Sequence, residues 1–249
     1  MKPHCLLMPN KFTYRSCESE LLDAPYIPKK MLIRNLHELD FINRVLGGHT
    51  ITLEGIKKIV TEKDKLYHIV DLGCGSGGTM KCIAGWARAK GYQVKLTGVD
   101  KNADVINYLN DNCKDYPEIS GVVSDYHDFL KTTHTIDIIH CSLFCHHLKD
   151  DELVELFTYL SLFTKTGYVI NDLQRNRLAY YGVQVITYLL HGSALSKNDG
   201  PVSILRAFKL AELNKLLQKA QAKNFCIKRK WAFRYLIVGR TESYEAKAG

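Results

Sequence analysis

Residues 68–79 place three glycines at alternate positions directly after a short apolar run. The run ends at Asp71, and the glycines follow at Gly73, Gly75 and Gly77. Alternating glycines after a buried strand predict a turn so tight that a Cβ atom would obstruct either the backbone or a ligand pressed against it. This feature predicts an α/β fold in which the turn joins a strand to a helix.

Asp71 indicates which ligand such a turn favours. Gly73, Gly75 and Gly78 also satisfy the spacing of a dinucleotide-binding turn. A pyrophosphate binds backbone N–H groups, however, and the carboxylate of Asp71 beside them would repel it. S-adenosyl-L-methionine (SAM) carries no phosphate, and a carboxylate attracts its sulfonium and ammonium groups. The acid-x-Gly-x-Gly-x-Gly pattern of residues 71–77 resembles motif I of the class I SAM-dependent methyltransferases. The resemblance implies SAM as the cofactor and S-adenosyl-L-homocysteine (SAH) as the product.

Two further acids end the next two expected strands. Asp100 follows residues 93–99, where an acid lies across the crevice from the glycine turn and can accept both ribose hydroxyls. Asp125 follows residues 119–124, and from its position alone it could equally be a turn residue. The resemblance implies that Asp125 and Tyr126 bind the adenine amino group and ring. The other residues expected beside the cofactor are Cys74, Lys101, Cys141 and Arg44.

The periodicity of the chain predicts a doubly wound sheet. Strands are expected at 67–72, 93–99, 119–124, 136–141 and 167–171, with helices near 78–90, 102–112 and 150–164. Strands separated by helices form a parallel sheet with helices on both faces. Two more strands, at 225–231 and 233–239, predict a tight C-terminal hairpin. The fold class is therefore α/β, a Rossmann-like class I methyltransferase fold with a mostly parallel seven-stranded sheet and an antiparallel C-terminal strand.

The 249 residues are expected to form a single methyltransferase domain, because no linker, repeat or low-complexity segment divides them. Residues 1–64 form an N-terminal helical extension, with two helices within 31–64, and residues 65–174 form the SAM-binding core. Residues 175–208 form a helical lid insertion that consists of an apolar helix and a polar loop. Residues 209–239 hold the last helix and the hairpin, and residues 240–249 form a tail. The two additions are expected to fold over the carboxyl ends of the strands.

The composition indicates the cellular compartment of the protein and the kinds of partner it binds. Eight cysteines at irregular spacing, no apolar leader and no membrane span are typical of a cytoplasmic protein with reduced thiols. The net charge of +8 raises nucleic acid as a partner. Much of this charge lies within residues 209–230, where it is expected to form the solvated face of a helix and a strand, so nucleic acid is an unlikely partner. The oligomeric state cannot be inferred from the sequence.

The segment at 139–148, Ile-His-Cys-Ser-Leu-Phe-Cys-His-His-Leu, lacks the Asn/Asp-Pro-Pro-aromatic motif of enzymes that methylate amino groups of bases or glutamine. It resembles the Ser-Leu-x-x-His-His-Leu of many small-molecule methyltransferases. Further matches lie at 34–44, 169–175, 198–201 and 206–208. Together they resemble bacterial methyltransferases of secondary metabolism, some of which accompany polyketide synthases. The resemblance implies a small-molecule methyl acceptor, with His146 or His147 as a general base and Asp172 as its acidic partner.

A hydroxyl acceptor needs such a base, because a phenol or alcohol is largely protonated near neutrality and imidazole has a suitable pKa. The histidines could instead cap the helix that starts near Asp150. The segment around His140 and Cys145 is rich in potential metal ligands, but its spacing fits no metal motif, and no required metal is expected. An RNA- or protein-modifying enzyme and a SAM-binding protein without turnover remain alternatives. The acceptor, and the choice among O, N and C methylation, stay open.

Overall fold

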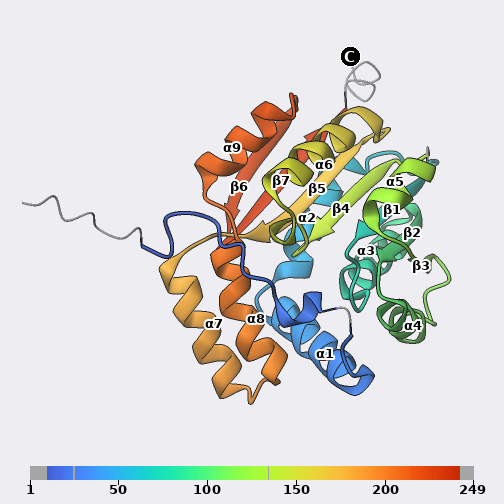
Figure 1. Ribbon diagram of the computed structural model, residues 1–249. Coiled ribbons are helices and arrows are strands. Elements are labelled where there is room, and N and C mark those ends of the chain that lie inside the picture. The colour runs from blue at the N-terminus through green and yellow to red at the C-terminus, as the bar shows by residue number, and fades with distance from the viewer. Residues whose placement is uncertain (1–9, 25, 134, 242–249) are drawn as a thin grey trace, which may run out of the picture.

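The computed structural model describes residues 10–24, 26–133 and 135–241. Its centre is a seven-stranded sheet of order β3-β2-β1-β4-β5-β7-β6, in which β7 runs antiparallel to both neighbours (Figure 1). The strands are β1 (Leu66–Leu72), β2 (Gln93–Asp100), β3 (Ile119–Val123), β4 (Ile138–Ser142), β5 (Gly167–Leu173), β6 (Phe225–Lys230) and β7 (Arg234–Arg240). The predicted class I methyltransferase fold is confirmed, including the antiparallel C-terminal strand.

The sheet is buried on both faces because its strands alternate apolar side chains between two helical layers. On one face, Ile138 and Val169 pack with α2 (Gly48–Ile59), α3 (Gly78–Lys90) and α4 (Ala103–Asn112). On the other, Ile139 and Ile170 pack with α5 (Tyr126–Thr132), α6 (Asp150–Phe163) and α9 (Leu210–Lys219). These layers hold the strands rigidly, so that their carboxyl ends form a fixed rim.

The other elements gather at that rim. Helix α1 (Lys29–Val45) lies close to α8 (Ala194–Arg206), which packs on α7 (Arg177–Leu189), and these three helices form the lower part of the molecule in Figure 1. The short turns η1 (Leu21–Asp23) and η2 (Cys145–His147) lie next to α8. The additions before β1 and after β5 are therefore near each other in space, although the sequence separates them widely.

Two sequence expectations differ from the structure. The polar stretch expected as a loop is helix α8, which continues through Pro201. Ser193 caps its N-terminus by accepting a hydrogen bond from Ser196 N on its side chain. The helix buries Leu195 and Val202, so packing overrides the local turn signals. The sequence also predicts no helix after Asp125, yet this residue caps α5.

The remaining expectations concern the ends and the thiols. Arg240 belongs to β7 and Thr241 is buried, whereas residues 242–249 of the expected tail lie outside the described residues. The seven cysteines within the described ranges are all free thiols. In the same ranges, no helix has both the length and the apolar character needed to cross a bilayer.

Candidate active site

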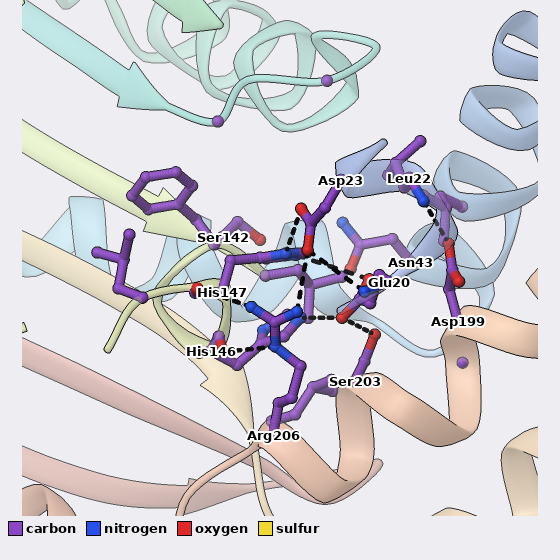
Figure 2. A pocket seen from close by; sticks show the side chains of 18 of the residues that line it. Glu20, Leu22, Asp23, Asn43, Ser142, His146, His147, Asp199, Ser203 and Arg206 are labelled. Carbon is purple, nitrogen blue, oxygen red and sulfur yellow. Dashed lines mark hydrogen bonds and ion pairs between the residues drawn. The ribbon is translucent and has the colours of Figure 1, made fainter. Parts of the chain in front are cut away.

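The rim encloses a cavity of about 2160 Å³, lined by the glycine turn, the ends of β1, β2 and β4, helices α1, α7 and α8, and the N-terminal segment before α1. In a doubly wound sheet, ligands bind outside the carboxyl ends of the strands. Figure 2 shows the part of this cavity around His146 and His147, where side chains from η1, η2 and α8 converge. The cavity is therefore the candidate active site.

The glycine turn has the tight backbone that the sequence predicts. Gly73 and Gly77 have φ values of 71° and 76°, in the left-handed region that L side chains rarely adopt. A Cβ atom at Gly73 would overlap the ring of Phe144, and one at Gly77 would lie 2.7 Å from Sγ of Cys113. The turn is therefore packed against the β4–η2 segment, which brings it close to the histidine pair.

Asp71 is a buried carboxylate with unsatisfied hydrogen-bonding capacity. Its exposed fraction is 3%, and Oδ1 has no hydrogen-bond partner among the described residues. His140 Nδ1 lies 3.4 Å away, but burial lowers the pKa of His140 to about 3, so this imidazole is neutral. Burial, and then the charge of Asp100, raise the pKa of Asp71 well above its usual range. Because an unpaired buried anion is costly, the cavity is prepared for a cationic ligand group at this point.

Asp100, Lys101, Asp125 and Tyr126 line the same cavity, as does Cys74. Asp100 Oδ1 accepts a hydrogen bond from Asn102 N at 2.9 Å, and burial raises the pKa of this carboxyl group. Asp125 Oδ1 accepts from His127 N at 2.9 Å, and the ring of Tyr126 stands edge-on to Phe144. The acids at the ends of β2 and β3 are thus brought together with the glycine turn along one wall.

Three residues expected beside the cofactor lie outside the cavity lining. Gly77 packs on Cys113, and Cys141 is fully buried in the core between the sheet and α6. Arg44 is on the exposed face of α1, where its guanidinium lies 5.8 Å from the ring centre of Phe41. Their neighbours Ser142 and Asn43 line the cavity instead, together with Gly75, which is itself one of the residues expected beside the cofactor.

His146 is buried between two carboxylates. Its Nδ1 lies 2.7 Å from Asp172 Oδ1, and its Nε2 lies 3.6 Å from Glu20 Oε1 on the opposite side of the ring. Burial alone would lower the pKa of His146, but the charges of Asp172 and Glu20 outweigh it and raise the pKa to about 9. The same charge pairing lowers the pKa of Asp172 against the effect of its own burial. His146 is therefore an imidazolium at neutral pH.

His147 is the more accessible member of the pair, with 22% of its side chain exposed. Its Nδ1 lies 3.2 Å from Asp23 Oδ1, and its Nε2 lies 3.8 Å from Glu20 Oε2. The two imidazole rings are 4.3 Å apart, and each has its Nδ1 beside its own carboxylate while its Nε2 faces Glu20. One ligand atom from each of Glu20, His146 and His147 lies within 4.8 Å of the others, a donor set that also suits a divalent transition metal.

Sequence reasoning missed Glu20, Asp23 and Arg206. Arg206 Nη1 donates to Asp23 Oδ2 at 2.9 Å, and its other nitrogens donate to the carbonyls of His146 and His147. Glu20 accepts a hydrogen bond from Ser203 Oγ at 2.8 Å. These contacts join residues between 59 and 183 positions apart, so no local pattern could have shown them. The sequence signals were the acidic character of residues 18–23 and, for Arg206, its place in the family match at 206–208.

Comparison with known families gives a match over residues 69–167, to the family described as a methyltransferase domain. This range contains the glycine turn, the acids that end β1, β2 and β3, and the histidine pair. Comparison with curated proteins gives no match.

Solved structures with the same fold include several methyltransferases. The plantazolicin methyltransferase BpumL, in complex with a triazolic desmethylPZN analog and SAH, is 15% identical, with a TM-score of 0.60 and coverage of 86% of this chain and 98% of that one. The magnesium protoporphyrin IX methyltransferase of Synechocystis PCC 6803 with bound SAH is 14% identical, with a TM-score of 0.54 and coverage of 86% and 100%. The CMeT domain of the citrinin polyketide synthase is also 14% identical, with a TM-score of 0.54 and coverage of 77% and 50%.

Proposed function

We propose that the chain transfers the methyl group of SAM to a hydroxyl group of a small molecule, such as a phenol or a polyketide-like alcohol. The match of residues 69–167 to a methyltransferase domain and the strand order of the sheet support this proposal. The observation that carries this proposal is the buried His146, held between Asp172 and Glu20 in the wall of the cavity that also contains the glycine turn. A hydroxyl group that is protonated near neutrality needs a proton acceptor within hydrogen-bond reach.

The residues of the turn fit SAM. Within the described residues, the buried carboxyl group of Asp71 has no hydrogen-bond partner at Oδ1, which suits the ammonium or sulfonium group. Asp100 would hold the ribose hydroxyls, and Asp125 with Tyr126 would hold the adenine. When bound, SAM supplies an activated methyl group, so the protein's main task is to align the acceptor oxygen with it.

His146 is proposed to take the proton of the acceptor. Asp172 fixes the ring through Nδ1, so the proton would be received at Nε2, on the side that faces Glu20. A pKa of about 9 for the imidazolium is close to the value of about 10 that is usual for a phenol. Proton transfer between groups of similar pKa is nearly balanced, which favours a phenolic acceptor over an aliphatic alcohol. Only neutral His146 can accept a proton, and at neutral pH a minor fraction of the protein holds His146 in this form.

The cover over the histidine pair supports a small acceptor rather than RNA or protein. The N-terminal segment covers the histidine pair: Arg15 donates to the carbonyls of His146 and Leu148, and Leu21 N and Leu22 N donate to Asp199 on α8. The structural neighbours include a methyltransferase in complex with a triazolic desmethylPZN analog and a methyltransferase named for magnesium protoporphyrin IX. These features also favour a catalyst over a SAM-binding protein without turnover, because His146 is positioned beside space for a second ligand.

The test is formation of SAH from SAM over a panel of phenols and polyketide-like alcohols. With a positive acceptor, His146→Gln should lower turnover by about two to four powers of ten and leave SAM affinity nearly unchanged. His37→Gln, at an exposed histidine that contacts Tyr108, is the matched control and should retain activity. Unchanged turnover in His146→Gln would contradict the role of His146 as the base. Loss of activity in EDTA that a divalent metal restores would instead indicate a metal held by Glu20, His146 and His147.

A further inference from the structure

Arg234, the first residue of β7, is a buried arginine that lines the cavity. Its exposed fraction is 2%, and it lies opposite Leu173, at the carboxyl end of β5. Burial lowers the pKa of Arg234 to about 10, so the side chain still carries its full charge at neutral pH. A positive charge is thus fixed inside the cavity, on a rigid strand.

Two amide side chains direct their oxygens at this guanidinium. Asn43 Oδ1 accepts from Nη2 at 3.0 Å, and Asn171 Oδ1 lies 3.5 Å from Nη1. The orientation of each amide is set on its other side: Asn43 Nδ2 lies 3.1 Å from His49 Nδ1, and Asn171 Nδ2 donates to Gly48 O at 2.8 Å. The guanidinium is therefore held in place by neutral groups whose own positions are fixed.

The charge of Arg234 is unpaired within the part of the chain that the structure describes. Its Nε has no hydrogen-bond partner there, and no carboxylate lies within ion-pair distance of it. The other buried arginines differ, because Arg175 pairs with Glu212 and Arg206 pairs with Asp23. The charge of Asp172 acts on Arg234 and partly offsets the effect of burial on its pKa, but the Asp172 carboxylate is hydrogen-bonded to His146 and to Leu173 N rather than to Arg234. A buried cation without an anion is costly, and the cost is recovered when an anionic group binds.

We propose that Arg234 is the binding residue for a carboxylate of a ligand in the cavity, held bidentately by the guanidinium. The same cavity contains Asp71, a buried carboxyl group whose Oδ1 also has no partner among the described residues. Two buried groups that carry opposite charges when ionised, each incompletely paired, suit a ligand that carries both charges. The α-amino acid end of SAM is such a group, and a carboxylate on the methyl acceptor is the other source of the same chemistry.

This subsite rests on the proposed methyltransferase function. It is tested by ligand binding without turnover, so a protein that failed to methylate phenols could still show the predicted change in binding. Calorimetry would compare SAM with decarboxylated SAM, which lacks only the carboxylate, on the wild-type protein and on Arg234→Gln. If SAM supplies the carboxylate, Arg234→Gln should weaken SAM about 10- to 100-fold and decarboxylated SAM less than threefold. If the acceptor supplies the carboxylate, the affinities for SAM and for decarboxylated SAM should be unchanged in Arg234→Gln. The binding of benzoate to the SAH-loaded variant should then be lost.

Asn43→Asp is a second variant that keeps Arg234 and tests the same idea in the opposite direction. It places a carboxylate where Asn43 Oδ1 now contacts the guanidinium, so the ligand-free protein should keep or gain thermal stability. The internal anion should compete with the ligand and reproduce the selective loss of affinity. Arg175→Gln, at a buried arginine paired with Glu212, is the matched control for loss of a buried guanidinium and should not discriminate SAM from its decarboxylated form. Unchanged binding of SAM and benzoate in both Arg234→Gln and Asn43→Asp would overturn the proposal.

Discussion

The charge pairing of His146 should make the stability of the fold depend on pH in a defined window. In the unfolded chain a histidine has a pKa of about 6.5, whereas in the folded protein Asp172 and Glu20, acting against burial, raise the pKa of His146 to about 9. A difference of about 2.5 units corresponds to about 3 kcal/mol of free energy of unfolding. Because the folded pKa is the higher one, this stabilisation is fully present below about pH 6.5 and is lost as the pH rises through about 9.

The perturbation is His146→Gln, which removes the titrating group. Urea denaturation at pH 6, 7.5 and 9.5 would give the free energy of unfolding of the wild type and the variant. The wild type should lose about 3 kcal/mol more than the variant between pH 6 and pH 9.5, since the carboxylates stay ionised throughout this range. The difference between the two proteins isolates His146 from the other groups that titrate there.

His37→Gln supplies the matched control, because this histidine is exposed and contacts Tyr108 rather than a buried carboxylate. It should reproduce the wild-type dependence. The reasoning would be refuted if His146→Gln kept the wild-type slope between pH 6 and pH 9.5, because the imidazolium would then gain nothing from its two carboxylates.

Three other perturbations follow from the site. Turnover of a phenol, measured as a pH–rate profile at saturating SAM, should rise with pH up to about 9. Asp172→Asn should move this rise to lower pH, and a profile flat from pH 6 to 9 would contradict the role of His146 as the base. Gly73→Ala should destabilise the fold by about 1–3 kcal/mol and abolish SAM binding in calorimetry, because a Cβ would meet Phe144 at a positive φ; wild-type affinity would show that the turn can relax. Asp71→Asn should raise the free energy of unfolding of the ligand-free protein at pH 8 by about 1 kcal/mol or more, since the raised pKa makes ionisation of Asp71 unfavourable in the fold, while SAM affinity falls; a less stable variant would refute this.

Local patterns in the sequence were enough to predict the sheet. The apolar run before Asp71 and the alternation of Gln93–Asp100 each specify a strand through neighbouring side chains alone, so β1 and β2 begin and end within a residue of the expected positions. Helix α8 was missed because Asn198, Gly200 and Pro201 give turn signals locally. Burial of one helix face in the tertiary structure outweighs those signals.

The candidate site likewise has residues that the sequence could predict and residues that it could not. Residues that follow directly from a strand end, such as Asp71, Asp100 and His146, could be placed at the rim from the sequence. The groups that determine the charge of His146 could not, because Glu20 approaches it from a segment 126 positions earlier in the chain. Likewise, the distinction between Arg44 and its neighbour Asn43 depends on the rotation of α1 against the sheet, which no motif reports.

The reversed direction of β7 has a consequence for how this fold can diversify. In an all-parallel sheet, a strand can offer the ligand rim only the residues at its end, where the chain is already leaving the sheet. Because β7 runs the other way, its beginning lies at the rim, and both Arg234 and the preceding residues Ala232 and Phe233 border the cavity. The hairpin thus places side chains in the wall of the cavity without altering the turn after β1. Substitutions at the β6–β7 junction can therefore change the chemistry of this wall while the glycine turn stays the same.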